Sequence, residues 1–143
     1  NLWGPTSLFT RNRRRMEDGG FGLGGEAMGT KVKTINIAKD YSLTPFGRYP
    51  SDGKFNGERF RKERLLPALK EFDQVVVELD GTTISYGSSF LEETFGGLVR
   101  VEGMKPEEVK KRISVRTDLE DYKLEIDFYI ERAATHTEHQ FAH

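Results

Sequence analysis

The sequence predicts an α/β domain, and three observations support this fold class. Residues 75–79 are rich in β-branched and apolar side chains, which is typical of a strand that is buried on both faces. Asp80 and Gly81 follow with the residue types of a turn. Apolar side chains between residues 90 and 98 then recur at steps of three and four, as on one face of a helix. A buried strand that leads into an amphipathic helix forms the core of an α/β domain.

Length and composition narrow the class of protein. The 143 residues provide one domain with room for tails. Hydrophobic residues make up 36% and charged residues 31%, which indicates a small core under a charged surface. A formal net charge of −1 argues against a general nucleic-acid binder, and no apolar run has the length of a membrane span. Because there is no cysteine, disulfides and a cysteine nucleophile are excluded, and we expect a cytoplasmic protein.

The two ends of the chain do not share the patterns of the middle. Residues 1–30 are rich in glycine and arginine and show no helical or strand period, so we predict a flexible arm. Residues 31–134 are predicted to form the domain, and residues 135–143 a frayed tail. His136, His139 and His143 have the spacing of one helix face, which would suit a metal ion. A frayed tail also explains this polar segment, and we predict no metal site.

The first half of the domain is predicted to contain a strand, a long connection and a helix. Residues 33–37 alternate polar and apolar, as in a strand with one buried face. Residues 41–56 combine turn formers with aromatics, which indicates either a binding loop or a connection fixed to the core. Residues 58–72 have a helical period, with Asn56 as the candidate N-cap. An interior proline costs roughly 3 kcal/mol, so we expect a kink or break at Pro67, with the proline opening a second short helix.

The second half continues with two more helices and a strand. Gly96 and Gly97 weaken the helix that contains residues 90–98, and they indicate either its end or a close backbone contact. Residues 106–112 begin with proline and acids and end with bases, which is typical of a short helix. Residues 113–116 alternate as a strand. Asp118 is the predicted cap of a last helix, whose apolar face continues to Ala133.

Two serines stand at the start of the helix that contains residues 90–98, and we predict that this first turn faces solvent. Ser89 and Glu92 match a capping box, in which the hydroxyl accepts one backbone N–H and the glutamate accepts another. Such a cap contributes about 0.5–2 kcal/mol, which by itself accounts for the serine.

Taken together, residues from about 31 to 133 resemble the STAS-like domain family of unknown function, a relative of the STAS domains of anti-sigma factor antagonists and sulfate transporters. The most specific matching piece is SSFLEETFGGLVR, from Ser88 to Arg100. Shorter pieces match at residues 35–37, 45–53, 57–61 and 79–81. The resemblance implies a mixed β-sheet of about four to five strands with helices packed against it.

The resemblance also implies a function for the serines. In anti-sigma factor antagonists, a histidine-kinase-like ATPase phosphorylates a serine in an Asp-Ser-Ser-Gly string that begins a helix, and the phosphate ejects the bound kinase. Ser88 and Ser89 stand in the matching place and are therefore phospho-acceptor candidates. Here Gly87 stands where the aspartate would be, and Phe90 replaces the glycine. A histidine-kinase-like ATPase or another signalling protein is the partner that the resemblance implies.

We therefore expect a non-enzymatic regulatory or protein-interaction module, with no catalytic residue, no cofactor, and no nucleic-acid or membrane partner. Its predicted contact surface is the start of the helix from Ser88 together with the adjacent loop 45–57. The predicted binding residues are Arg48, Asp52, Asp80, Glu92 and Arg100.

The alternative is a small-molecule or nucleotide-sensing domain that uses the same loop and helix start. Arg48, Asp52 and Ser88 would then surround a polar pocket. Arg48, Arg59 and Arg61 would form an anion site near the loop, unless acidic neighbours such as Asp52 and Glu58 pair with them instead.

Overall fold

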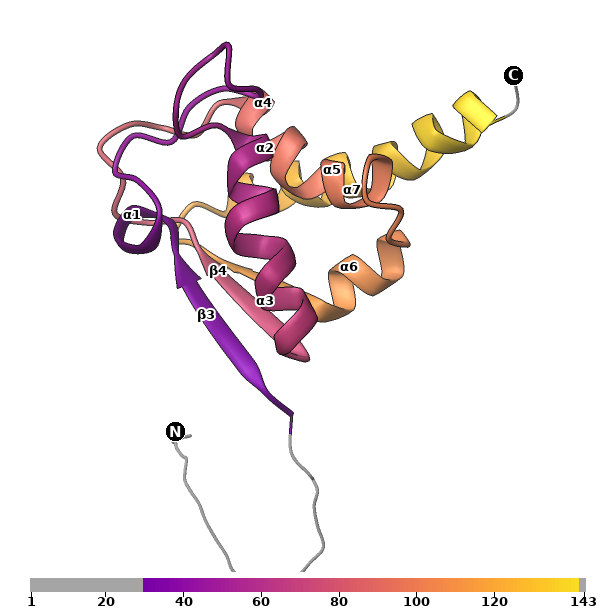
Figure 1. Cartoon of the computed structure of the whole chain (residues 1–143), viewed down its shortest axis with the longest axis horizontal. Coiled ribbons are helices and arrows are strands. Elements are labelled where there is room, and N and C mark those ends of the chain that lie inside the picture. The colour runs from indigo at the N-terminus through magenta and orange to yellow at the C-terminus, as the bar shows by residue number, and fades with distance from the viewer. Residues whose placement is uncertain (1–29, 142–143) are drawn as a thin grey trace, which may run out of the picture. The chain divides into compact units, whose positions relative to one another are not determined.

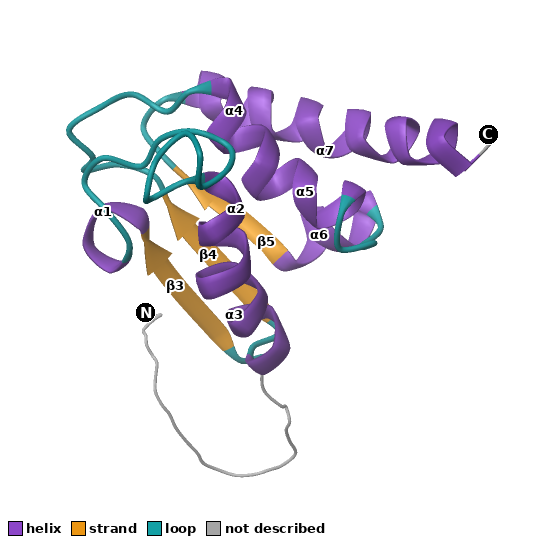
Figure 2. Ribbon diagram, turned by 45° about the horizontal axis from the view of Figure 1, so that its top comes forward, coloured by secondary structure: helices purple, strands orange, loops and turns teal. Residues whose placement is uncertain are grey.

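Three parallel strands form the sheet of this protein (Figures 1 and 2). The computed structural model describes residues 30–141, and side chains as far as residue 135. Within this part of the chain, β3 (Val32–Asn36), β4 (Gln74–Glu78) and β5 (Ile113–Arg116) lie in the order β3-β4-β5, with every pair parallel. The strands lie close to their predicted positions. The mixed sheet of four to five strands is not confirmed, since residues 30–141 contribute three strands of one direction.

Among residues 30–141, the packing elements cover one face of the sheet. Ile35 and Val77, which are register partners, are buried, as is Ile113 beside Val75. On the opposite face Thr34 and Ser114 are exposed and Val76, the partner of both, is half-buried. The prediction that the central strand is buried on both faces is therefore wrong for its second face. The reason is that the helices of both crossovers pack on the Val77 side, whereas most parallel sheets are covered on both sides.

The first crossover carries a short helix, α1 (Ile37–Asp40), a long loop, and one continuous helical stretch. This stretch consists of α2 (Gly57–Phe60), a π-helical turn η1 (Arg61–Leu65) and α3 (Leu66–Glu71). The side chain of Asn56 accepts the backbone N–H of Arg59 at 2.9 Å, which confirms the predicted N-cap. Pro67 is the second residue of α3 and follows the π-helical turn η1 almost directly. The predicted change of helix is present, but the chain remains helical because a π turn precedes the proline.

The second crossover begins with a helix that we call the α4–α5 helix, composed of α4 (Ser88–Leu91), η2 (Glu92–Gly96) and α5 (Gly97–Arg100). Its apolar face is buried as predicted, through Phe90, Leu91, Phe95 and Leu98. The predicted capping box is wrong. The helix begins at Ser88 with Gly87 at the N-cap and no side-chain cap, because Glu92 pairs with arginines instead of turning back to Ser89.

The α4–α5 helix crosses the Gly57 end of α2 at close range. A Cβ at Gly57 would lie 2.7 Å from the backbone oxygen of Phe90, so only glycine permits this approach. Phe60 and Phe90 pack beside the crossing, with ring centroids 6.2 Å apart. This contact fixes the serine-bearing turn relative to the loop that precedes α2.

The chain ends with α6 (Pro106–Arg112), β5 and α7 (Glu120–Phe141). The predicted helix 106–112 is confirmed, and the buried residues of α7 are Ile126, Ile130 and Ala133. Leu119, predicted on the same face, is exposed. Among residues 30–141, no helix combines the length and the apolar composition that a bilayer crossing requires. Residues 1–29 of the predicted arm lie outside the part that the structure describes, and so do the side chains of His136, His139 and His143.

Candidate functional site

The loop 45–57 presents Arg48 to the α4–α5 helix. The Asp52 carboxylate accepts the backbone N–H groups of Arg48 at 3.0 Å and of Tyr49 at 3.1 Å. These two hydrogen bonds hold the pKa of Asp52 below its usual value. Gly47 turns the chain with a φ of 85°, which favours glycine. Asp52, predicted as a binding residue, therefore shapes the loop that carries Arg48.

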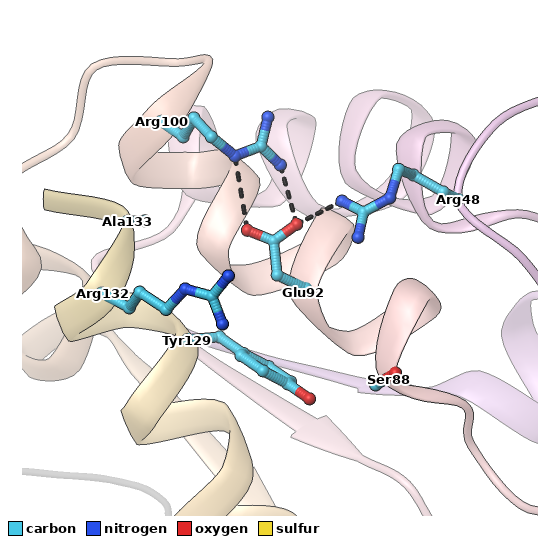
Figure 3. Close-up of a pocket in the computed structure, with 7 residues that line it drawn as sticks. All are labelled: Arg48, Ser88, Glu92, Arg100, Tyr129, Arg132 and Ala133. Atoms are coloured by element: carbon cyan, nitrogen blue, oxygen red, sulfur yellow. Dashed lines mark hydrogen bonds and ion pairs between the residues drawn. The ribbon is translucent and has the colours of Figure 1, made fainter. Parts of the chain in front are cut away.

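The side chain of Arg48 reaches across to two adjacent glutamates. It pairs with Glu92 and, at 2.9 Å, with Glu93. Arg100, at the other end of the same helix, also meets both: its Nη2 lies 2.9 Å from Glu92 and 3.0 Å from Glu93. Figure 3 shows Glu92 held between Arg48 and Arg100. Arg48 and Arg100 thus share the same pair of carboxylates, although they lie 52 positions apart in the sequence.

Glu93 is the buried member of this pair, and a third arginine reaches it from inside the domain. Arg61 Nη1 donates to the Glu93 carboxylate at 2.8 Å and to the Glu93 backbone oxygen at 2.6 Å, and Arg61 Nε donates to Glu102 at 2.9 Å. Both Arg61 and Glu93 have only 1% of the side chain exposed. Burial raises the pKa of Glu93, but hydrogen bonds from Arg61, Arg48 and Arg100 outweigh it and hold this pKa below its usual value.

The two glycines of the helix make room for these charges. A Cβ at Gly97 would lie 2.2 Å from Nη1 of Arg61, so a larger residue would collide with the buried guanidinium. A Cβ at Gly96 would lie 2.7 Å from a carboxylate oxygen of Glu92. Of the two alternatives left by the sequence, the close contact is therefore confirmed, and the helix continues to Arg100.

A hollow of about 410 Å³ opens between the α4–α5 helix and α7. We call it the arginine hollow, because three of its seven lining residues are arginines. Its lining consists of Arg48, Ser88, Glu92, Arg100, Tyr129, Arg132 and Ala133 (Figure 3).

Two lining residues come from α7 and were not predicted as site residues. Burial, followed by the hydrogen bond to Glu125, raises the pKa of Tyr129 to about 12, so its hydroxyl remains a hydrogen-bond donor at neutral pH. Arg132 lies over the ring of Phe128, 5.9 Å from its centroid, and no described carboxylate pairs with it. Their spacing of three residues on one helix is the sequence signal that would have brought Tyr129 and Arg132 together.

Four of the predicted site residues meet at the arginine hollow. Ser88, Arg48, Glu92 and Arg100 all line it, and Ser88 is exposed. Ser89 is also exposed in the same first turn. These placements agree with the expectation of a solvent-facing helix start.

Asp80 lies away from the arginine hollow. Its carboxylate accepts the Thr117 hydroxyl and the backbone N–H of Asp118, both at 2.9 Å. Asp80 thus ties the end of β4 to the turn before α7, and Asp118, the predicted cap, donates its backbone N–H to Asp80 two positions before α7 begins at Glu120.

The anion site that we considered for Arg48, Arg59 and Arg61 is not formed. Arg59 pairs with Glu63 at 2.9 Å and Arg61 is buried, so the three side chains point to different partners. Among the described residues, no three His, Asp or Glu side chains are grouped so that they would hold a metal ion.

The arrangement is suited to recognising negative charge. Three guanidinium groups, a serine hydroxyl and a tyrosine hydroxyl face one solvent-accessible space, and only one carboxylate lines it. Arginines bind carboxylates and phosphates through paired N–H donors, which gives direction as well as strength.

One comparison with known proteins gave a match, to part of this domain. Residues 56–123 match the family model described as a STAS-like domain of unknown function, and this span includes β4, the α4–α5 helix, α6 and β5. Searches of curated proteins and of solved structures gave no match. The match agrees with the resemblance noted in the SSFLEETFGGLVR segment. Residues 56–123 are thus similar to the STAS-like domain family of unknown function, over somewhat less than half of the chain.

Proposed function

We propose that this domain is a non-enzymatic regulatory module that binds a partner protein through the first turn of the α4–α5 helix and the loop 45–57. The observation that carries the proposal is the position of Ser88: it is exposed, it begins the helix, and it shares the arginine hollow with three guanidinium groups. A regulatory surface of this kind requires no chemistry by the domain itself.

The proposed switch is phosphorylation of Ser88 or Ser89. A phosphoserine carries about −1.5 to −2 charges and three strong acceptor oxygens. At Ser88 such a group would face the guanidinium groups of the arginine hollow and also the carboxylate of Glu92. The modification would therefore change the charge of the contact surface, which would alter the binding of a partner.

The proposed partner is a histidine-kinase-like ATPase or another signalling protein. This part of the proposal rests on the relation between STAS-like domains and the STAS domains of anti-sigma factor antagonists.

The experiment that tests the switch is incubation of the full chain with a cognate histidine-kinase-like ATPase and ATP, followed by intact mass measurement. We expect one added phosphoryl group, its loss in the Ser88→Ala, Ser89→Ala double variant, and its retention in one of the two single variants. Thr83→Ala, at an exposed hydroxyl that lies outside the α4–α5 helix, is the matched control and should leave the modification unchanged. No added mass, or mass that survives the double change, would contradict the proposal.

A second candidate is a small-molecule or nucleotide-sensing domain, and the arginine hollow favours it. Its volume of about 410 Å³ falls in the range of ligand pockets, and polar groups converge in it. In this candidate Arg48 and Ser88 contact the ligand, and Asp52 acts by holding the loop. Thermal denaturation with and without ATP, ADP and AMP tests it: a rise in melting temperature supports sensing, and equal melting temperatures for all three count against it.

A further inference from the structure

We infer that Glu92 is the built-in occupant of an anion site in the arginine hollow, and that a phosphate monoester displaces it from Arg48 and Arg100. The inference rests on the regulatory function proposed above, because it concerns the same surface. It applies to one chemical group from either of two sources, namely a phosphoryl group carried by Ser88 or a free phosphorylated ligand.

The two glutamates differ in how firmly they are held. Glu93 has 1% of its side chain exposed and is fixed from inside by Arg61, whereas Glu92 has 21% exposed and faces the hollow. Glu92 is therefore free to turn into water, and Glu93 is not.

Arg48 and Arg100 each contact both glutamates. Their contacts with Glu93, at 2.9 and 3.0 Å, do not depend on Glu92. When Glu92 leaves, Glu93 still holds the two guanidinium groups in place, and the donors that had faced Glu92 become available. A binding site whose groups are already oriented loses less freedom when the ligand arrives.

The hollow offers a third cation and the Ser88 hydroxyl to the same anion, whereas the Tyr129 hydroxyl already donates to Glu125. Figure 3 shows the guanidinium groups of Arg48, Arg100 and Arg132 arranged around Glu92. Among the described residues no carboxylate pairs with Arg132, whose guanidinium lies over the ring of Phe128. The three guanidinium groups exceed in charge the two carboxylates that face them, Glu92 and Glu93, and this excess of positive charge attracts an anion.

A phosphate monoester competes well with Glu92 at this position. It carries up to two negative charges where the carboxylate carries one, and its oxygens accept paired donors from arginine. The displaced Glu92 carboxylate gains hydration, which offsets part of its lost ion pairs. We therefore expect phosphate binding and the position of Glu92 to be coupled.

The coupling would give the proposed regulatory surface two charge patterns. Without phosphate, Glu92 is drawn into the hollow; with phosphate, its carboxylate lies on the surface near Ser88 and Ser89. A partner that binds this turn would distinguish the two patterns by charge.

The test is calorimetric titration of the full chain with phenyl phosphate, at a pH at which the probe is a dianion. Glu92→Gln removes the competing charge and should tighten binding by about fivefold to tenfold, the equivalent of one lost ionic competitor. Arg132→Gln should weaken binding by a similar factor. The control is Glu63→Gln, which removes an ion-paired but more exposed carboxylate that contacts Arg59 outside the hollow, and it should leave the affinity unchanged.

Gly96→Ala provides a second variant that keeps every charge. The new Cβ would lie 2.7 Å from the Glu92 carboxylate, which must move, and so this variant should also bind phenyl phosphate more tightly than the wild type. If Glu92→Gln does not fold, as judged by circular dichroism, Gly96→Ala decides. Unchanged or weaker binding in a folded variant of either kind overturns the inference, as does absence of binding to the wild type and to both variants.

Two further titrations distinguish the two sources of phosphate, a phosphorylated Ser88 and a free ligand. In Ser88→Ala, which keeps all three guanidinium groups, a site for free ligands should still bind the probe, with an affinity lowered only by the loss of one hydroxyl donor. In chain phosphorylated at Ser88, the probe should bind at least tenfold more weakly if the attached phosphoryl group fills the hollow. Because the titration needs no phosphoryl transfer, failure of the phosphorylation experiment leaves its result interpretable.

Discussion

At the scale of single residues, two adjacent glycines each leave space for a different charged side chain. Gly97 leaves space for Arg61, which is buried and cannot move away, and Gly96 leaves space for Glu92, whose end reaches solvent. The same substitution should therefore have different effects at neighbouring positions of one helix.

We expect Gly97→Ala to lose about 3–5 kcal/mol of unfolding free energy, as when a buried ion pair is broken. Gly96→Ala should change it by less than about 1 kcal/mol, because helix propensity favours alanine and Glu92 is able to shift. Urea unfolding of both variants measures the difference. Equal losses at the two positions would contradict the assigned roles.

Thr94 offers a test of an unsatisfied polar group. Its side chain is buried, and its hydroxyl has no hydrogen-bond partner among the described residues. Thr94→Val keeps the shape and removes the uncompensated hydroxyl, so we expect a gain of ~1 kcal/mol in unfolding free energy. Thr94→Ser keeps the hydroxyl and removes a methyl group, and it should be less stable than the wild type. A loss of stability in the valine variant would show that this hydroxyl has a partner.

Glu93 should make the domain sensitive to acid. Its pKa is lower in the folded chain than the ordinary value of 4.5, so the unfolded chain binds its proton first as the pH falls. The stabilisation is complete above this ordinary value and is lost as the pH falls through the folded pKa. Urea unfolding at a series of pH values should show a flatter acid limb in Glu93→Gln, together with a loss of about 3–5 kcal/mol at neutral pH. An unchanged acid limb would contradict this, and Glu63→Gln is the control.

Sequence patterns predict some residue roles better than others. The N-cap of Asn56 was predictable, because its partner is three positions away. The role of Glu92 was not, because a capping box is a local pattern and the arginine that competes for Glu92 comes from a loop 44 positions earlier. The burial of Arg61 was not predictable either, because its partners Glu93 and Glu102 lie 32 and 41 positions further along the chain.

At the scale of secondary-structure elements, each of the two helices that meet at the site contains a π-helical turn. Arg61 begins η1, and Glu92 and Glu93 begin η2, so the buried ion pair joins the two turns. Such turns are frequent at functional sites. Hydrophobic period predicted both helices correctly, but period does not distinguish a π turn from an α turn, and so this feature came only from the structure.

The loop 45–57 is tied to the α4–α5 helix by Arg48. Arg48→Gln removes its ion pairs with Glu92 and Glu93, so we expect faster amide hydrogen exchange in residues 46–55 by about tenfold, and little change in β4. Arg59→Gln, which removes an exposed pair with Glu63, is the matched control. Equal exchange in the two variants would mean that Asp52 and the backbone hydrogen bonds hold the loop without Arg48.

At the scale of the whole molecule, the sheet has one covered face and one that is open among the described residues. The sequence suggested two covered faces, because a run of valines has no alternation to mark the open side. The order of the strands, and the side on which both crossovers pack, depend on contacts between residues far apart in the chain. Local patterns do not carry this information.

The predicted separation of residues 1–30 from the domain is testable at this scale. We expect a chain that begins at residue 30 to unfold in urea with a midpoint equal to that of the full chain, because the elements of the fold begin at Val32. A lower midpoint would mean that the earlier residues contribute to the stability of the domain. In that case, comparing the effect of Val76→Thr on the midpoint in the full and the shortened chain would test whether this contribution involves the open face.

Glu93 receives arginines from three separate stretches of the chain, and this has a consequence for mutagenesis. The contributions of Arg48, Arg61 and Arg100 are not independent, because the loss of one changes how strongly the other two are attracted to the shared carboxylate. Their individual substitutions should therefore be non-additive, and only thermodynamic cycles that combine them in pairs will apportion the energy.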